Sequence, residues 1–76
     1  MPTLDEIPTG RSGRINALSG PTGLVQRLLE FGIMEGEEVR VLTRAPLGDP
    51  IEIQSVMTRL SLRKAEAVHI HVILID

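Results

Sequence analysis

Apolar and polar residues alternate with a period of two in three segments of this chain, residues 39–44, 51–55 and 68–74. This period is typical of β-strands, in which successive side chains point to opposite faces of a sheet. Shorter segments of the same kind, residues 13–18 and 59–62, predict two further strands. We expect these strands to turn their apolar side chains toward a common core.

A longer period marks the main helix, which the pattern predicts over about residues 22–31. Leu24, Leu28 and Phe31 are spaced four and three residues apart, so they fall on one stripe, and we expect that stripe to be core. Gly32 follows at the position where many helices end in a left-handed residue. A helix of this length is marginal alone and has to be held by packing.

Turn-forming residues separate these segments. Thr3 and Glu6 have the spacing of a capping box and predict one helical turn near the N-terminus, and residues 63–67 predict another. Residues 19–23 and 46–50 are rich in Gly and Pro and break the chain. The pattern therefore predicts a mainly β fold, a small barrel of about five short antiparallel strands with one inserted α-helix.

Length and composition limit the classes of function. The chain has 76 residues, which we interpret as a single domain over residues 1–76. Its net charge of −2 disfavours a nucleic-acid partner, because such binding depends on neutralising phosphates. The absence of Cys excludes disulfides and thiolate metal centres. No apolar run is long enough to span a membrane and no signal peptide is evident, so we expect a cytoplasmic protein without membrane insertion.

No catalytic motif is evident in the sequence. The glycine-containing segment at residues 20–23 lacks the Lys of a phosphate-binding loop and is better interpreted as a turn before the helix. The two histidines lie together near the C-terminus, and no Ser–His–Asp signature accompanies them. We therefore expect neither enzymatic activity nor a cofactor.

His69 and His71 are the weak candidates for a metal site. Residues two apart on a strand share a face, so both imidazoles could approach one ion. Stable sites usually have three or four ligands, however, and the sequence identifies no third. We expect two partly exposed histidines on the outer face of the last strand rather than a metal site.

Residues 44–50 form the most unusual segment. Pro46 and Pro50 restrict the backbone, Gly48 permits a positive φ, and Asp49 can accept hydrogen bonds from its own backbone. Two interpretations are open. The segment is a turn that fixes the pairing of its flanking strands, or it is a rigid loop that contacts a partner with little loss of entropy.

Several sequence blocks together resemble the FeoA family. They are QRLLEFGI at residues 26–33, APLGDPI at residues 45–51 and LSLRKAEA at residues 60–67, with Gly36 and the Val39–Val41 segment between the first two. Each block alone is a weak signal, whereas their order and spacing together are specific. The resemblance covers nearly the whole chain.

The resemblance implies an SH3-like barrel with an inserted helix. It also implies a cytosolic accessory role in bacterial ferrous iron transport, exerted by contact with the cytosolic part of FeoB, the membrane permease that carries a GTP-binding domain. Most of the positions that match the family pattern fit fold-defining roles. These positions are Arg27, Leu28, Gly32, Gly36, Pro46, Gly48, Asp49, Pro50, Leu62, Arg63 and Ala67.

Two departures from the family pattern are evident. Glu35 stands where the family often has Pro, and the hairpin at residues 56–58 lacks a glycine that is common there. Met57 tolerates positive φ poorly and, if exposed, would suit a contact role. We predict that the partner contacts are made by the loop of residues 44–50, the outer face of the helix and this methionine. The candidates are Arg27, Glu30, Arg44, Pro46, Leu47, Gly48, Asp49, Pro50 and Met57.

Other functions remain open. The C-terminal SH3-like domain of DtxR-type iron regulators resembles this family, so a metal-sensing or regulatory module is the alternative, although no DNA-binding helix pair is evident. Arg27 could act as an arginine finger on the GTPase of the permease, for which its expected exposure is the only support. Ile73 and Ile75, on the less buried side of the last strand, suggest a homo-oligomer.

Overall fold

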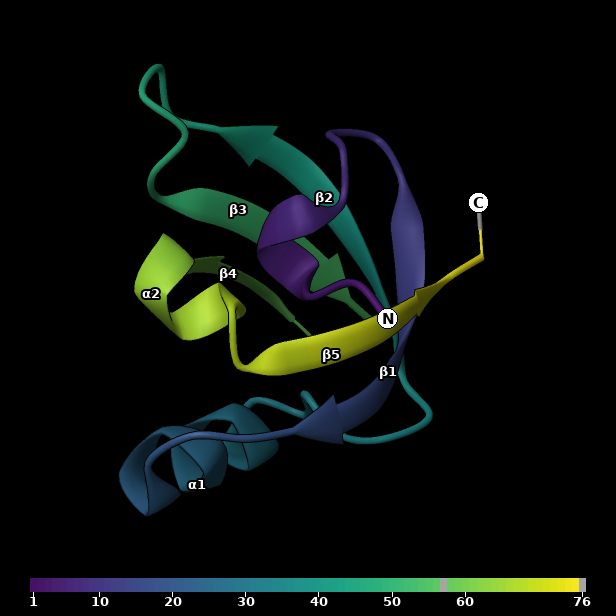
Figure 1. Ribbon diagram of the computed structural model, residues 1–76, viewed down its shortest axis with the longest axis vertical. Coiled ribbons are helices and arrows are strands. Elements are labelled where there is room, and N and C mark those ends of the chain that lie inside the picture. The colour runs from purple at the N-terminus through teal and green to yellow at the C-terminus, as the bar shows by residue number, and fades with distance from the viewer. Residues whose placement is uncertain (57, 76) are drawn as a thin grey trace.

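Five strands and two α-helices follow a short 3₁₀ helix in the computed structural model, which describes residues 1–56 and 58–75 (Figure 1). Every predicted strand and helix is present within these residues. In chain order the elements are η1 (Leu4–Glu6), β1 (Ser12–Leu18), α1 (Thr22–Glu30), β2 (Glu38–Arg44), β3 (Ile51–Ser55), β4 (Arg59–Leu62), α2 (Lys64–Ala67) and β5 (Ile70–Leu74).

All the strands belong to one antiparallel sheet in the order β4-β3-β2-β1-β5. The sheet curls round a central core, with α1 inserted between β1 and β2 at its lower side and α2 between β4 and β5 (Figure 1). The mainly β class, with five antiparallel strands and an inserted helix, is therefore confirmed.

The N-terminal segment lies against the edge strand β5. The backbone N–H of Thr3 donates to Glu6 at 2.8 Å, which confirms the predicted capping box and its single helical turn. Thr3 also forms an isolated bridge with His71, and the N–H of Val72 donates to the carbonyl of Pro2 at 3.0 Å. The middle of the β5 edge is thus covered by the start of the chain.

The core is wholly aliphatic and receives side chains from every strand and helix. Each element contributes one or two of them, so all the elements share one cluster. Its buried apolar members are Leu4, Ile7, Ile15, Leu28, Ile33, Val39, Val41, Ile51, Ile53, Leu62, Ala67, Ile70 and Val72.

The prediction that Leu24, Leu28 and Phe31 form a core stripe is wrong at the C-terminal end of the helix. Leu28 is fully buried, but Phe31 is 44% exposed. The helix ends one residue earlier than predicted, and Gly32 then takes a φ of 83°. This left-handed residue reverses the chain so that the N–H of Ile33 donates to the carbonyl of Leu28 at 2.9 Å. Ile33 enters the core in place of the phenylalanine.

The two-residue alternation is interrupted in two of the strands. In β2 the pairing shifts between Val41, which faces Ile53, and Thr43, which faces Glu52. One extra residue in a strand exchanges its two faces beyond that point, and Thr43 is accordingly exposed. A second irregularity lies in β1, and the last strand begins at Ile70 rather than at residue 68.

Candidate functional site

A groove of about 440 Å³ lies between the end of α1 and the β4–α2 segment. Its apolar part comes from the exposed face of Phe31, from Pro50 and from β4, and its charged part comes from the two helices. The lining residues are Arg27, Phe31, Pro50, Leu60, Ser61, Leu62, Arg63 and Glu66. An apolar floor with arginines at its rim is typical of protein contact surfaces.

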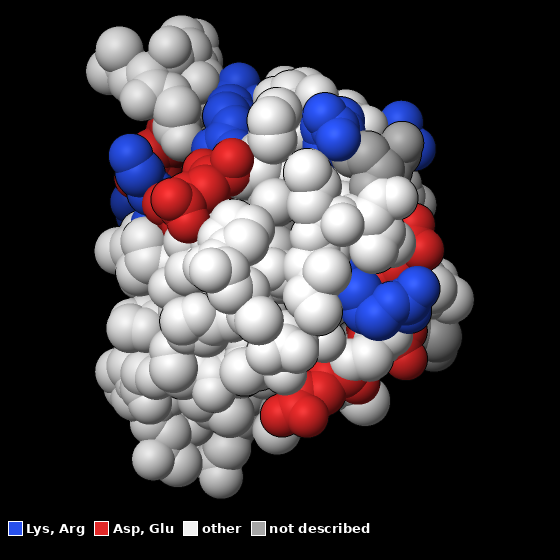
Figure 2. All heavy atoms as spheres, turned by 45° about the vertical axis from the view of Figure 1, so that its right-hand side comes forward, with Lys and Arg blue, Asp and Glu red and all other residues white. Residues whose placement is uncertain are grey.

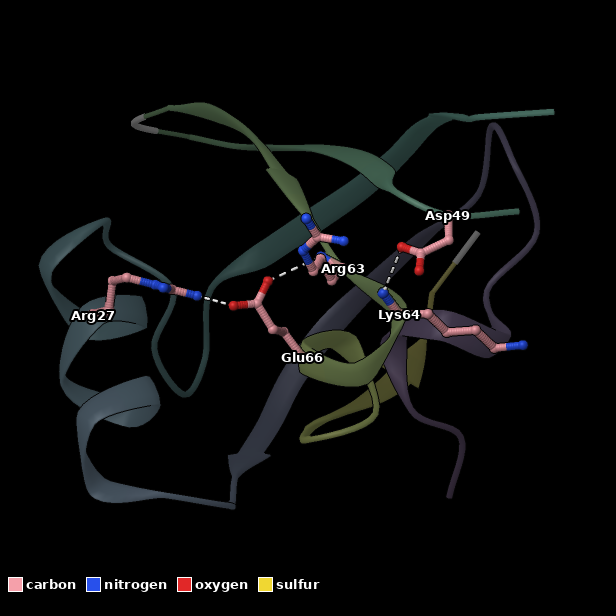
Figure 3. Close-up of polar contacts among 5 residues, drawn as sticks. All are labelled: Arg27, Asp49, Arg63, Lys64 and Glu66. Atoms are coloured by element: carbon pink, nitrogen blue, oxygen red, sulfur yellow. Dashed lines mark hydrogen bonds and ion pairs between the residues drawn. The ribbon is translucent and has the colours of Figure 1, made fainter. Parts of the chain in front are cut away.

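Glu66 lies at the charged side of this groove (Figure 3). Its Oε1 atom accepts a hydrogen bond from the backbone N–H of Arg63 at 2.9 Å, and Oε2 forms an ion pair with the guanidinium of Arg27. The Arg63 hydrogen bond does most to lower the pKa of Glu66, partial burial opposes it, and Arg27 lowers the pKa further. The ionised carboxylate therefore joins α1 to α2.

The guanidinium of Arg27 forms an ion pair, whereas that of Arg63 forms none with the described residues. Arg63 is exposed, and none of the described residues accepts a hydrogen bond from its side chain. It stands at the N-terminal end of α2, beside the apolar wall of the groove. The charge of Arg63 also helps to lower the pKa of Glu66, and its exposed guanidinium can be reached by an acidic group of a partner.

The loop of residues 44–50 is fixed at its base and exposed at its tip. The N–H of Ala45 donates to the carbonyl of Pro50 at 3.0 Å, and the N–H of Gly48 donates to Ala45 at 2.7 Å. Gly48 has a φ of 87°, as its position in the turn requires. Leu47 is 97% exposed. The segment is a turn between paired strands that also holds a leucine in solvent.

Asp49 connects this loop to the groove. The sequence suggested that its carboxylate would accept hydrogen bonds from its own loop, but Oδ1 accepts one from the N–H of Lys64, 15 residues away, at 3.0 Å (Figure 3). The carboxylate therefore satisfies one of the unpaired amides at the start of α2. Pro50, the next residue, lines the groove.

Two predicted contact arginines are engaged within the chain. Arg44 is partly buried and donates to the carbonyl oxygens of Asp5, at 3.0 Å, and Ile7, so it fastens the N-terminal segment to β2. Arg27 was expected to face a partner from the outer side of α1. Its guanidinium instead reaches across to the carboxylate of Glu66. Glu30 is exposed on α1, and Met57 lies outside the described residues.

His69 and His71 are both partly exposed, as predicted, but His69 lies in the turn before β5 and not on the strand. Within the described residues, no three or more His, Cys, Asp or Glu side chains are grouped so that they could hold a metal ion. The hydroxyl of Ser19 nevertheless lies 3.0 Å from Nε2 of His71 and 3.4 Å from Nδ1 of His69.

Basic and acidic side chains lie in small mixed groups on the face of the molecule shown in Figure 2, and much of its lower left is uncharged. No extended basic patch covers this face of the described residues.

The sequence interpretation missed Glu66 and the exposed Phe31 as parts of this surface. A signal for Glu66 was present, because Arg63 precedes the first residue of α2 and a glutamate three residues later is the spacing of a capping glutamate. No comparable signal existed for Phe31, because its exposure depends on where the helix ends.

Comparison with known proteins places this arrangement in a family. The model of the FeoA domain matches residues 3–74. The chain belongs to the FeoA family. FeoA proteins are non-catalytic accessory proteins, which confirms the prediction that the chain is not an enzyme.

Three relatives illustrate the match. An Fe(2+) transport protein A/Fe(2+) transporter FeoB fusion protein of Porphyromonas gingivalis is 35% identical over 73 residues, 96% of this chain but only 9% of the fusion protein. The solution structure of a FeoA protein from Chlorobium tepidum is 31% identical, with a TM-score of 0.91 over 97% of this chain and 70% of that one.

The third relative is the zinc complex of FeoA from Stenotrophomonas maltophilia, described as a prokaryotic SH3 domain protein. It is 34% identical, with a TM-score of 0.81 over 92% of this chain and 87% of that one. This likeness confirms the SH3-like fold expected from the family resemblance. Among the helices of the described residues, none has the length and apolar character needed to cross a membrane.

Proposed function

We propose that this FeoA-family protein is a cytoplasmic accessory protein of bacterial ferrous iron transport and that it binds the cytosolic part of a FeoB-type transporter. The observation that carries the proposal is the fusion protein of Porphyromonas gingivalis, in which sequence similar to this chain shares one polypeptide with a FeoB transporter. Fusion keeps two domains at a high effective concentration. Partners on separate chains need a binding surface that serves the same purpose.

The groove and the Leu47 loop form the surface that suits this role. Leu47 offers a nearly fully exposed apolar side chain on a turn fixed by two backbone hydrogen bonds. A backbone held in this way loses little freedom on binding. Through Asp49 and Pro50 the loop is continuous with the groove, where Arg63 can pair with a carboxylate. An apolar anchor beside an arginine is a common centre of binding energy.

A titration of the purified protein against the cytosolic fragment of a FeoB-type transporter tests this proposal. Leu47→Asp places a charge at the apolar anchor, so we expect affinity to fall about tenfold or more, equivalent to about 1.4 kcal/mol. Because Leu47 is 97% exposed, the free energy of unfolding should change by no more than about 0.5 kcal/mol. Arg63→Glu should also weaken binding by reversing the charge at the groove.

Ile75→Asp is the matched control. Ile75 is an exposed apolar residue just beyond the end of β5, far along the chain from the loop and the groove. It should bind like the wild type. Wild-type affinity of Leu47→Asp would remove the loop from the interface, and no binding by the wild-type protein would overturn the proposed partner.

A further inference from the structure

We propose that His69 and His71, together with Ser19, form a binding site for a late first-row divalent cation such as Zn²⁺. The site is separate from the groove and from the Leu47 loop, and it does not depend on the proposed function. It rests on the convergence of two imidazole nitrogens on one hydroxyl oxygen, at 3.0 Å for Nε2 of His71 and 3.4 Å for Nδ1 of His69.

Strand pairing creates this convergence. Strand β5 pairs with β1, so that Ala17 faces His71 and Leu18 faces Ile70. Ser19 follows directly, and its N–H donates to the carbonyl of His69 at 2.9 Å. His69 is the turn residue directly before β5 and His71 lies on β5, and a ring nitrogen of each lies within 3.4 Å of the Ser19 hydroxyl. The backbone therefore brings all three side chains together.

Close packing fixes the ring of His69. Gly20 has a φ of 95°, and a Cβ atom built there would lie 2.8 Å from Cγ and Nδ1 of that ring. The imidazole therefore rests directly on the backbone of the turn before α1. A ligand side chain held by its surroundings gives up less freedom when it binds an ion. Both rings are partly exposed, so an ion can reach them from solvent.

The donor set selects the class of cation. The Ser19 hydroxyl lies 3.3 Å from the carbonyl of His69 and can donate its proton there, which leaves its lone pairs facing the rings. Without metal these lone pairs can accept the ring N–H groups. With metal, each neutral ring takes the other tautomer and turns a nitrogen lone pair toward the ion, with no net loss of protons.

Two imidazole nitrogens and one hydroxyl suit zinc, copper, nickel or ferrous ions, whereas Mg²⁺ prefers oxygen ligands and keeps its water. The described part of the chain supplies three groups to this site, so water must complete the coordination. Structural zinc sites with four protein ligands should therefore bind more tightly than this one.

The test is a titration of the full chain with Zn²⁺, followed by calorimetry and by ¹⁵N NMR of the histidine rings. We expect one ion per chain and selective shifts of Nδ1 of His69 and Nε2 of His71, the nitrogens that face Ser19. His69→Gln and His71→Gln should each weaken binding about tenfold or more, since one of two nitrogen ligands is lost. Ser19→Ala should weaken it less, and Mg²⁺ should not compete.

Circular dichroism and thermal unfolding of each variant show whether it remains folded, and the ring shifts of the wild-type protein do not depend on any variant. Unchanged zinc affinity in the His69→Gln/His71→Gln double variant would overturn the proposal, because the ion would then bind elsewhere. Ring nitrogens that do not respond to millimolar Zn²⁺ would overturn it as well.

Discussion

Two elements that are remote in sequence meet at the carboxylate of Glu66. The N–H of Arg63 and the guanidinium of Arg27 both favour its ionised form, so its pKa in the folded protein lies below the ordinary value of about 4.5. A carboxylate with a lowered pKa stabilises the fold above its unfolded-state pKa. That contribution is lost as the pH falls through the lowered value.

We predict that Glu66→Gln lowers the free energy of unfolding by about 1 kcal/mol at pH 7, because a helix-capping bond and a partly exposed ion pair are both weakened. The difference from the wild type should shrink once the pH falls below about 4.5 and should be smallest near the acid limit of folding. Urea unfolding at pH 7 and at about pH 3 measures both values.

Glu30→Gln is the control for this prediction, since Glu30 is an exposed glutamate of α1. It should leave the stability of the protein unchanged at both pH values. Equal destabilisation by Glu66→Gln at pH 7 and at pH 3 would contradict an effect of the ionised carboxylate.

At the scale of elements, α2 is a single turn of four residues, Lys64–Ala67, and a helix so short does not form alone. It is held by the hydrogen bond from its first amide to Asp49, by Glu66, and by the burial of Ala67 in the core. The loop of residues 44–50 and α1 are thus both attached to the same turn.

We predict that Asp49→Ala lowers the free energy of unfolding by about 1 kcal/mol, the usual effect of losing a capping side chain. Asp49→Asn keeps an acceptor oxygen and should cost only a part of this. Hydrogen exchange should show the amide of Lys64 less protected in the alanine variant. An asparagine variant as unstable as the alanine variant would indicate that charge, rather than the hydrogen bond, is what matters.

The elements could largely be predicted from the sequence because local signals determine them. The period of two marks the strands, and Gly32 marks the end of α1 within one residue. The irregularities in β1 and β2 could not be predicted, since they depend on pairing between strands. The groove could not be predicted either, because it depends on a contact between Arg27 and Glu66, which are 39 residues apart in sequence. The loop tip at Leu47 followed from local turn chemistry.

At the scale of the whole molecule, stability depends on one aliphatic cluster. Leu28 and Leu29 are neighbours in α1 but differ in environment, since Leu28 is 0% exposed and Leu29 is 44% exposed. Removing a fully buried side chain leaves a cavity as well as losing its transfer free energy. A domain of this size has little stability to lose.

We predict that Leu28→Ala lowers the free energy of unfolding by about 2–5 kcal/mol. Leu29→Ala has the same chemistry at a surface position and should change it by less than about 1 kcal/mol. Chemical denaturation of both variants measures the difference. Similar losses for the two variants would contradict the assignment of the core face of α1.

One edge strand of the sheet, β5, is partly covered by the N-terminal segment, whereas the other, β4, is left open by the described residues. This difference limits how the protein can assemble. The start of the chain occupies the middle of β5 through Pro2 and Thr3, whereas no segment of the described residues pairs with the outer side of β4. A strand from another molecule would therefore add at β4. Two copies joined there would each keep a capped far edge, so growth by this route stops at a pair and does not continue into a fibre.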